Sequence, residues 1–310
     1  DKMIKSISLQ NRNQKSMIVM SICFFLSFAV FSCGNKSNSD SMQKPNEIIL
    51  YPAVMGLEKV HGLSESTTFD LTVGGKDAFV YHTKEIKDEF EHVKQLKSIS
   101  YQGVSYVNFS MDAKVELEVT SDSKVDKWRI LPGSNIETVT TDNSLKFVLD
   151  KPMKFVVSAI KEGKEEFFII SAEVPETKVP SRNDESVLFL EPGVHQYGQA
   201  WDPFINGINT LYISGGAVLE ATIKSKNKEN VKILGRGVIS QSFTTHAEES
   251  SENAEEREEE WDADWLGIVF MDSKNIEIDG IAAISKDEFP VPIGGSVNEF
   301  SLPTGTVELP

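Results

Sequence analysis

The feature that most constrains the fold is an internal repeat between Asn209 and Phe243. Residues 209–223 (NTLYISGGAVLEATI) and 229–243 (ENVKILGRGVISQSF) superimpose with an offset of 20 residues. Each copy is a short apolar strand, a glycine-containing turn and a second short apolar strand. A period of this length is typical of solenoids, because one such unit cannot bury its apolar face alone. We therefore expect the start of a parallel β-helix over residues 185–285.

The alignment of the two copies also predicts which residues stack on one another. Apolar positions in both copies include those that point into the coil and contact the coil above. Gly215 and Gly235 fall where the chain leaves one sheet for the next, so we expect a positive φ or a close backbone approach there. The alignment pairs Leu211 with Val231, Ile213 with Ile233, Gly215 with Gly235, Val218 with Val238 and Leu219 with Ile239.

A partial third copy at 275–285 (NIEIDGIAAIS) comes late, because an acidic insert at 246–264 precedes it. Eight Glu residues lie between Glu248 and Glu260, and a block of like charge is usually solvated. The alternative is a saccharide site in which Trp261 and Trp265 stack on sugar rings beside Asp262 and Asp264. A Ca²⁺ site at these carboxylates is a third interpretation, but no Ca²⁺-loop spacing is present.

The segment before the repeat, residues 45–178, consists of short β segments separated by turns. Val115 to Val119 alternates apolar and polar residues, as a half-buried strand does. Strands at this spacing predict a β-sandwich of about 130 residues, and helix formers at 84–97 predict one short helix inside it. Trp128 is the only Trp of this segment, so an aromatic strip for carbohydrate binding is not evident. The Pro-rich segment 175–184 marks the boundary with the β-helix.

The first 32 residues resemble a bacterial lipoprotein signal peptide. Four Lys and Arg residues precede Met17–Phe31, an uncharged and mostly apolar run too short to span a bilayer. A small residue directly before Cys33 resembles a lipobox, and an ordinary signal peptide with an incidental Cys is the alternative. We expect Cys33 to be lipidated, residues 33–44 to form a tether, and the protein to be anchored in the bacterial cell envelope, periplasmic or at the cell surface.

Charge and cysteine content exclude several classes of partner. The formal net charge of −16 over 310 residues argues against nucleic acid, since phosphate binding needs clustered Lys and Arg. Of the two Cys residues, Cys23 lies within the predicted signal peptide, so Cys33 alone would remain. A disulfide within the mature chain and a Cys-based metal site are then impossible. We expect no metal, no cofactor and no membrane contact beyond the lipid anchor.

Three motifs in this order resemble one group of enzymes: FLEPGVHQYG from Phe189, NTLYISGGAVLEATI from Asn209 and NVKILGRGVISQ from Asn230. They are similar to the entry into bacterial β-helix glycoside hydrolases of the dextranase and polygalacturonase type, in the pectin-lyase-like superfamily. With the sandwich included, the likeness covers about residues 45–285. It implies an all-β fold, an N-terminal β-sandwich followed by the first coils of a right-handed parallel β-helix, and a polysaccharide or oligosaccharide as partner.

The catalytic motifs of these families are absent from the sequence. Glycoside hydrolysis needs two carboxyl groups flanking the scissile bond, and the resemblance places them on Asp residues of later coils. Asp279 is expected to be a polar corner residue and His195 a hydrogen-bonding turn residue. We expect residues 286–310 to be an irregular tail or a truncated end, with Phe300–Leu309 as an alternative cap, and the catalytic pair to lie beyond this chain.

Three functions remain open on these grounds. The first is the N-terminal part of a lipid-anchored glycoside hydrolase that cleaves O-glycosyl bonds with paired Asp residues. The second is a polysaccharide lyase on the same fold, with Ca²⁺ and a basic residue in place of the Asp pair. The third is a non-catalytic glycan-binding lipoprotein.

Overall fold

The computed structural model describes residues 47–83, 86–88, 99–101, 103–133, 136–241, 267–284, 300–301 and 307–309, with only the backbone of 86–88, 99–101, 300–301 and 307–309. These residues belong to one compact unit, Lys44–Pro310. The predicted signal peptide, Cys33 and the tether lie outside the described residues. Within the described ranges, no helix is long and apolar enough to cross a membrane.

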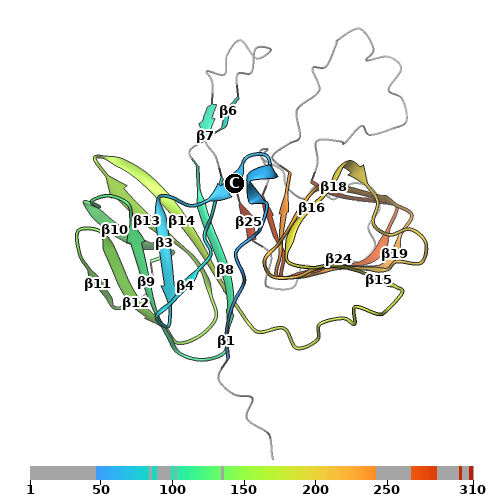
Figure 1. Ribbon diagram of the computed structural model, residues 1–310, viewed down its shortest axis with the longest axis horizontal. Coiled ribbons are helices and arrows are strands. Elements are labelled where there is room, and N and C mark those ends of the chain that lie inside the picture. Colours follow the sequence, from blue (N-terminus) through green and yellow to red (C-terminus); the bar gives the residue numbers. More distant parts are fainter. Residues whose placement is uncertain are drawn as a thin grey trace, which may run out of the picture. The chain divides into compact units, whose positions relative to one another are not determined.

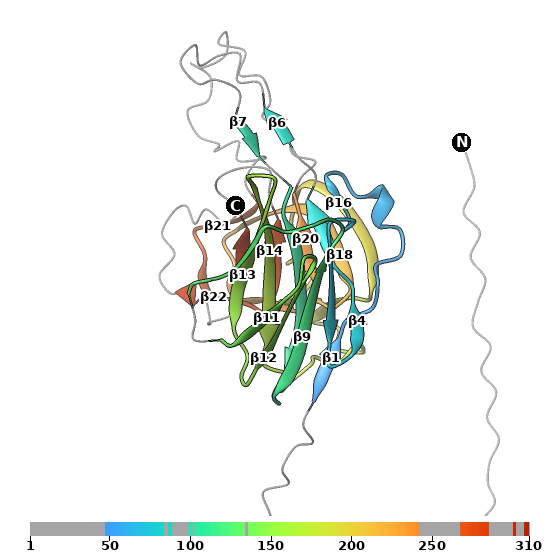
Figure 2. The same ribbon diagram turned by 90° about the vertical axis from the view of Figure 1, so that its left-hand side faces the viewer.

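The first half of the described chain forms a β-sandwich of two sheets (Figures 1 and 2). In sheet A the strand order is β10-β13-β14-β8-β5-β2, and β1 also pairs with β8. Its strands are β1 (Ile48–Leu50), β2 (Leu63–Glu65), β5 (Tyr81–Thr83), β8 (Ser105–Met111), β10 (Lys127–Leu131), β13 (Lys154–Lys161) and β14 (Lys164–Glu173). Sheet B has the order β11-β12-β9-β3-β4, with β3 (Phe69–Val73), β4 (Lys76–Ala78), β9 (Val115–Ser121), β11 (Thr138–Thr140) and β12 (Ser144–Leu149).

Alternating apolar residues of both sheets fill the sandwich core. In β9 the buried positions Val115, Leu117 and Val119 alternate with the more exposed Glu116 and Glu118, as predicted. A single one-turn 3-10 helix, η1 (Leu57–Lys59), occurs among the described residues before β2. The helix predicted at 84–97 is wrong at 86–88, because β6 (Ile86–Asp88) pairs antiparallel with β7 (Ile99–Tyr101). The rest of that segment lies outside the described residues.

The second half forms a parallel β-helix from two stacks of strands. Coil sheet 1 has the order β15-β17-β19-β22-β24, with β15 (Val187–Leu190), β17 (Thr210–Ile213), β19 (Glu229–Gly235), β22 (Lys274–Asp279) and β24 (Phe300–Ser301). Coil sheet 2 has the order β16-β18-β20-β23-β25, with β16 (Gly193–Trp201), β18 (Ala217–Lys226), β20 (Val238–Ser240), β23 (Ala282–Ile284) and β25 (Val307–Leu309); β21 (Ile268–Met271) also pairs with β18. Every pairing in these two sheets is parallel. The all-β prediction of a sandwich followed by β-helix coils is confirmed.

The pairing register agrees with the repeat in coil sheet 2 and differs in coil sheet 1. Val218 pairs with Val238 as aligned, whereas Leu211 pairs with Ile233 instead of Val231. The corner after β17 is one residue longer than the corner after β19, and Gly235 still belongs to its strand. A shift of two residues keeps each side chain on the same sheet face, so the apolar interior is preserved.

The third copy stacks directly on the second. Val231 pairs with Ile276, so the acidic insert falls within one coil, between β20 and β21. Both Asn230 and Asn275 have positive φ, and the Asn275 side-chain amide donates to Asn230 Oδ1 across the coils. The short strands β24 and β25 add to the same sheets, within the segment 286–310 for which an irregular tail or a truncated end was expected.

The close approaches expected at the corner glycines are present. A Cβ at Gly235, where φ is +130°, would lie 1.9 Å from Ile213 O. Gly215 instead faces the Tyr51 ring, whose nearest atom would be 2.0 Å from an added Cβ. The outer face of coil sheet 2 packs on the sandwich side, where Val218 and Val238 join a buried cluster with Leu63.

Candidate functional site

The first coil contains the most irregular described strand, β16, at the edge of coil sheet 2. From Gln196 to Trp201 this strand advances five residues while its partner β18 advances three, from Glu220 to Ile223. The two extra residues form bulges, and Gly198 and Ala200 have φ of +77° and +53°. A left-handed Ala costs about 1 kcal/mol, and bulges re-aim side chains next to binding sites.

The bulges bring two aromatic side chains together. Tyr197 and Trp201 stack with ring centroids 4.0 Å apart and an interplanar angle of 8°. Trp201 packs partly on the interior of the coils, and Tyr197 lies against it with 45% of its surface exposed. The pair covers the end of the solenoid core, which must be capped.

Polar groups around this aromatic pair are held by the surrounding protein. The Ala200 N–H donates to Thr222 Oγ1 at 2.7 Å, which fixes the strained bulge. Glu220 is 7% exposed and accepts hydrogen bonds from the His61 backbone N–H, at 2.7 Å, and from the Gln196 amide. Hydrogen bonds therefore connect β16 to β18, and β18 to the segment after η1.

Asp202 directly follows Trp201, and its carboxylate, like that of Glu220, is hydrogen bonded by protein donors. Its Oδ1 accepts from the Ser225 hydroxyl at 2.9 Å and from the Phe204 N–H at 3.0 Å. Its Oδ2 lies 2.7 Å from the Lys228 ammonium. Both carboxylates near the pair, Asp202 and Glu220, are thus anchored by protein donors. The arrangement supplies an apolar ring surface with fixed polar neighbours, which suits binding of a sugar.

The predicted saccharide residues Trp261, Asp262, Asp264 and Trp265 lie outside the described residues. The described chain ends before them at Gln241 and resumes at Gly267, whose carbonyl accepts the Ile223 N–H at 2.8 Å. Ile223 is also the partner of Trp201. The last described residue before the insert, Gln241, and the first after it, Gly267, therefore both belong to the stretch of coil sheet 2 where the first coil carries the aromatic pair. We call this stretch the coil junction (197–201, 221–223, 241 and 267).

Asp279 lies at a corner as expected, whereas His195 makes the expected hydrogen bond from strand β16 instead of from a turn. His195 pairs with the buried Leu219, and its Nε2 hydrogen bonds with Glu191 O at 2.7 Å. Asp279 ends β22 at a corner, just before Gly280 with φ of +76°. Tyr197 and Trp201 were not among the predicted site residues. The sequence does show two aromatic residues four positions apart with Gly198 between them, which is a possible sign of a bulged aromatic pair.

An ionisable cluster lies where the segment after the sandwich meets coil sheet 1. Arg236 is 7% exposed, and its guanidinium donates to Val174 O at 3.0 Å and Gly235 O at 2.9 Å. Burial raises the pKa of Glu176 although the Tyr212 hydroxyl donates to this carboxylate at 2.8 Å. These contacts connect the segment after the sandwich to coil sheet 1.

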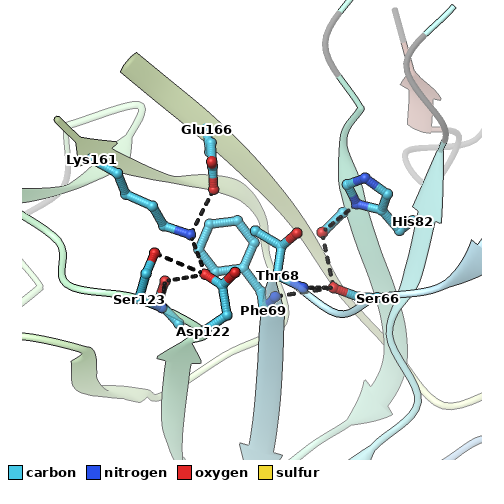
Figure 3. Close-up of polar contacts among 10 residues, drawn as sticks. Ser66, Thr68, Phe69, His82, Asp122, Ser123, Lys161 and Glu166 are labelled. Carbon is cyan, nitrogen blue, oxygen red and sulfur yellow. Dashed lines mark hydrogen bonds and ion pairs between the residues drawn. The ribbon is translucent and has the colours of Figure 1, made fainter. Parts of the chain in front are cut away.

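A buried lysine, Lys161, contacts two carboxylates and an aromatic ring at one end of the sandwich (Figure 3). The Lys161 ammonium lies 2.7 Å from carboxylate oxygens of both Asp122 and Glu166, and 4.8 Å from the Phe69 ring centroid. Partial burial alone would raise the pKa of Asp122, but hydrogen bonds from Lys161 and Ser123 lower it overall.

Beside this lysine, the His82 ring, Ser105 and Ser66 form a hydrogen-bonded chain (Figure 3). Ser105 is 1% exposed, so it is not an accessible nucleophile. No group of three or more His, Cys, Asp or Glu able to hold a metal ion occurs in the part of the chain that the structure describes.

Comparisons with known proteins support the fold. The chain is similar to the solved structure of Dex49A from Penicillium minioluteum, with a TM-score of 0.53 and 14% sequence identity. The similarity covers 77% of this chain and 58% of Dex49A, so the chain spans less than two thirds of that protein's length. No protein-family profile matches the sequence, and no curated protein matches it. At this identity the similarity shows the shared sandwich and β-helix fold.

Proposed function

We propose that this chain is the N-terminal part of an extracytoplasmic glycoside hydrolase that acts on a polysaccharide, and that the coil junction contacts the glycan. The observation that carries this proposal is the stacked pair at the first coil, in which Tyr197 keeps 45% of its surface exposed. A flat aromatic ring offers an apolar face to the C–H face of a sugar, and its phenolic hydroxyl serves as a polar handle.

The likeness to Dex49A and the sequence motifs support the choice of polysaccharide over other ligands. The proposed reaction is hydrolysis of an O-glycosyl bond by two Asp residues on coils beyond Pro310, as the family resemblance implies. Fold alone does not establish activity. We expect the purified chain to bind the glycan and to release no sugar from dextran or pectin; release of reducing sugar would contradict this division of roles.

Affinity electrophoresis of the full chain tests the glycan contact. Migration is compared in gels containing dextran, pectin or no polysaccharide, for wild type, Tyr197→Ala and Tyr197→Phe. We expect one polysaccharide to retard wild type and Tyr197→Phe, and the Ala variant to migrate as in an empty gel. Val139→Ala is the control, since Val139 is 67% exposed on the sandwich. Equal retardation of wild type and Tyr197→Ala would exclude the coil junction as the contact.

A non-catalytic glycan-binding lipoprotein is the second candidate. Asp202 and Glu220, the carboxylates at the coil junction, are both held by protein donors, and this favours binding without cleavage. Sequencing the encoding DNA past Pro310 separates the two. Further coils with paired Asp residues support the hydrolase, and a stop codon with no continuing coils supports the binding protein.

We also propose that the protein is anchored to the bacterial envelope through a lipid on Cys33, facing the periplasm or the cell surface. The support is the charged segment, apolar run and small residue that precede Cys33 in the sequence.

A further inference from the structure

A small cleft opens at one side of the β-sandwich, between the edge strand β10 of sheet A and the edge strand β11 of sheet B. Its volume is about 200 Å³. The lining combines apolar side chains, two hydroxyls and a guanidinium: Trp128, Ile130, Leu145, Thr138, Thr140 and Arg129. We infer that this cleft, the Trp128 cleft, binds a single neutral sugar ring.

The indole of Trp128 is held in position before any ligand arrives. Its ring centroid lies 6.5 Å from that of Phe69, and its Nε1–H donates to Thr141 O at 3.4 Å. Phe69 is fixed in turn by a parallel stack on Phe168 at 5.5 Å and by the Lys161 ammonium (Figure 3). A side chain that is already ordered loses little conformational entropy on binding.

The chemistry of the lining fits a sugar better than a wholly apolar ligand. Trp128 and Ile130, both half-buried, provide an apolar surface for C–H groups, while Thr138 and Thr140 offer hydroxyls to ring hydroxyls. All three residues of β11 are exposed, so these hydroxyls are accessible. Drug-sized ligands occupy pockets of roughly 300–1,000 Å³. A cleft of about 200 Å³ therefore suits one ring of a saccharide at a time.

A peptide that pairs with β10 as an additional strand is the alternative ligand at this edge. The charged residues of β10 argue against this alternative. Lys127 and Arg129 place two charges on this short edge strand, and Arg129 pairs with Glu165 at 3.4 Å. Charged residues on an edge strand oppose the addition of another strand.

This inference rests on the proposed function only for the class of ligand, because the cleft and the coil junction share no residues. If one polysaccharide chain touches both, the second contact raises its apparent affinity without taking part in hydrolysis.

Ligand-observed saturation-transfer NMR on the full chain tests the cleft, with methyl α-glucoside and methyl β-galactoside as probes. The variants are Trp128→Ala and the double variant Thr138→Val/Thr140→Val, whose substitutions are nearly isosteric on an exposed strand. The control is Val139→Thr on the same strand, where Val139 lines no part of the Trp128 cleft. Tyr197→Ala is measured alongside, because it removes the aromatic face of the coil junction and shows whether any of the signal comes from there.

We expect saturation transfer to at least one probe in wild type and in Val139→Thr. It should vanish in Trp128→Ala, and affinity should fall about tenfold, equivalent to about 1.4 kcal/mol, in the double Thr variant. The inference is overturned if neither probe binds, or if the folded double Thr variant binds as wild type does. Loss of the signal in Tyr197→Ala also overturns it and assigns the sugar to the coil junction. Failure of the proposed function looks different, since the polysaccharide gels then show no retardation while the monosaccharide signal persists.

Discussion

Replacing Gly235 with Ala should lower the free energy of unfolding more than a Gly→Ala substitution at another position with positive φ. An added Cβ would lie 1.9 Å from Ile213 O, whereas carbon and oxygen normally approach to about 3.3 Å. The two coils must therefore separate at this point. Ile213 O accepts both the Arg236 N–H and the Gly237 N–H at 2.9 Å, so separation weakens two hydrogen bonds. At about 1 kcal/mol each, with roughly 1–3 kcal/mol of backbone strain at φ of +130°, the expected loss is about 3–5 kcal/mol.

Urea unfolding followed by far-ultraviolet circular dichroism measures this loss, with two glycine controls. Gly163 has φ of +79° and open space around it, so Gly163→Ala isolates the conformational strain, about 1–2 kcal/mol. Gly133 has open space and no positive φ, and Gly133→Ala should leave the unfolding midpoint nearly unchanged. The reasoning is refuted if Gly235→Ala costs no more than Gly163→Ala, because the coils would then not approach as closely as the structure places them.

Three further predictions concern charge and lipidation. Burial raises the pKa of Glu176, so ionisation of this carboxyl weakens the fold as pH rises above the ordinary range of a Glu carboxyl. The urea midpoint of Glu176→Gln should therefore gain on that of wild type as pH rises from acid to neutral, and a constant difference would contradict the assigned burial. Lys161→Met should lose about 1 kcal/mol at neutral pH, since both carboxylate partners stay partly solvated. The pKa of Asp122 is lowered, so wild type loses stability as pH falls through that value; Lys161→Met should show a flatter acid limb, and an unchanged limb would contradict the assigned cause. Cys33→Ser should abolish labelling by a radioactive fatty acid in cells, and persistent labelling would place the lipid elsewhere.

The fold was predictable from the sequence because its strands repeat an apolar pattern. Ile276 and Ile278 of the third copy pair with Val231 and Ile233 despite the intervening insert. The register of Leu211 was not predictable. This register depends on the number of residues in each corner, and the sequence does not distinguish Gly-containing corners of different length.

The candidate site was less predictable than the fold. The bulges that bring Tyr197 onto Trp201 are defined by the pairing of β16 with β18, so the sequence of β16 shows only Gly198 as a local sign of them. The saccharide hypothesis for Trp261 and its neighbours remains a prediction, since those residues lie outside the described ranges. The helix prediction was wrong at Ile86–Asp88 because the pairing of this strand with β7 outweighs the helix propensity of its residues.

Hydrogen–deuterium exchange with and without the polysaccharide that retards the chain tests the central claim most directly. The account predicts slower exchange on binding in the peptides that cover 193–204 and 218–226, around the coil junction. Peptides from sheet B of the sandwich that do not line the Trp128 cleft, such as those covering β9, should exchange unchanged. Protection confined to the sandwich, with none at the coil junction, would contradict the account.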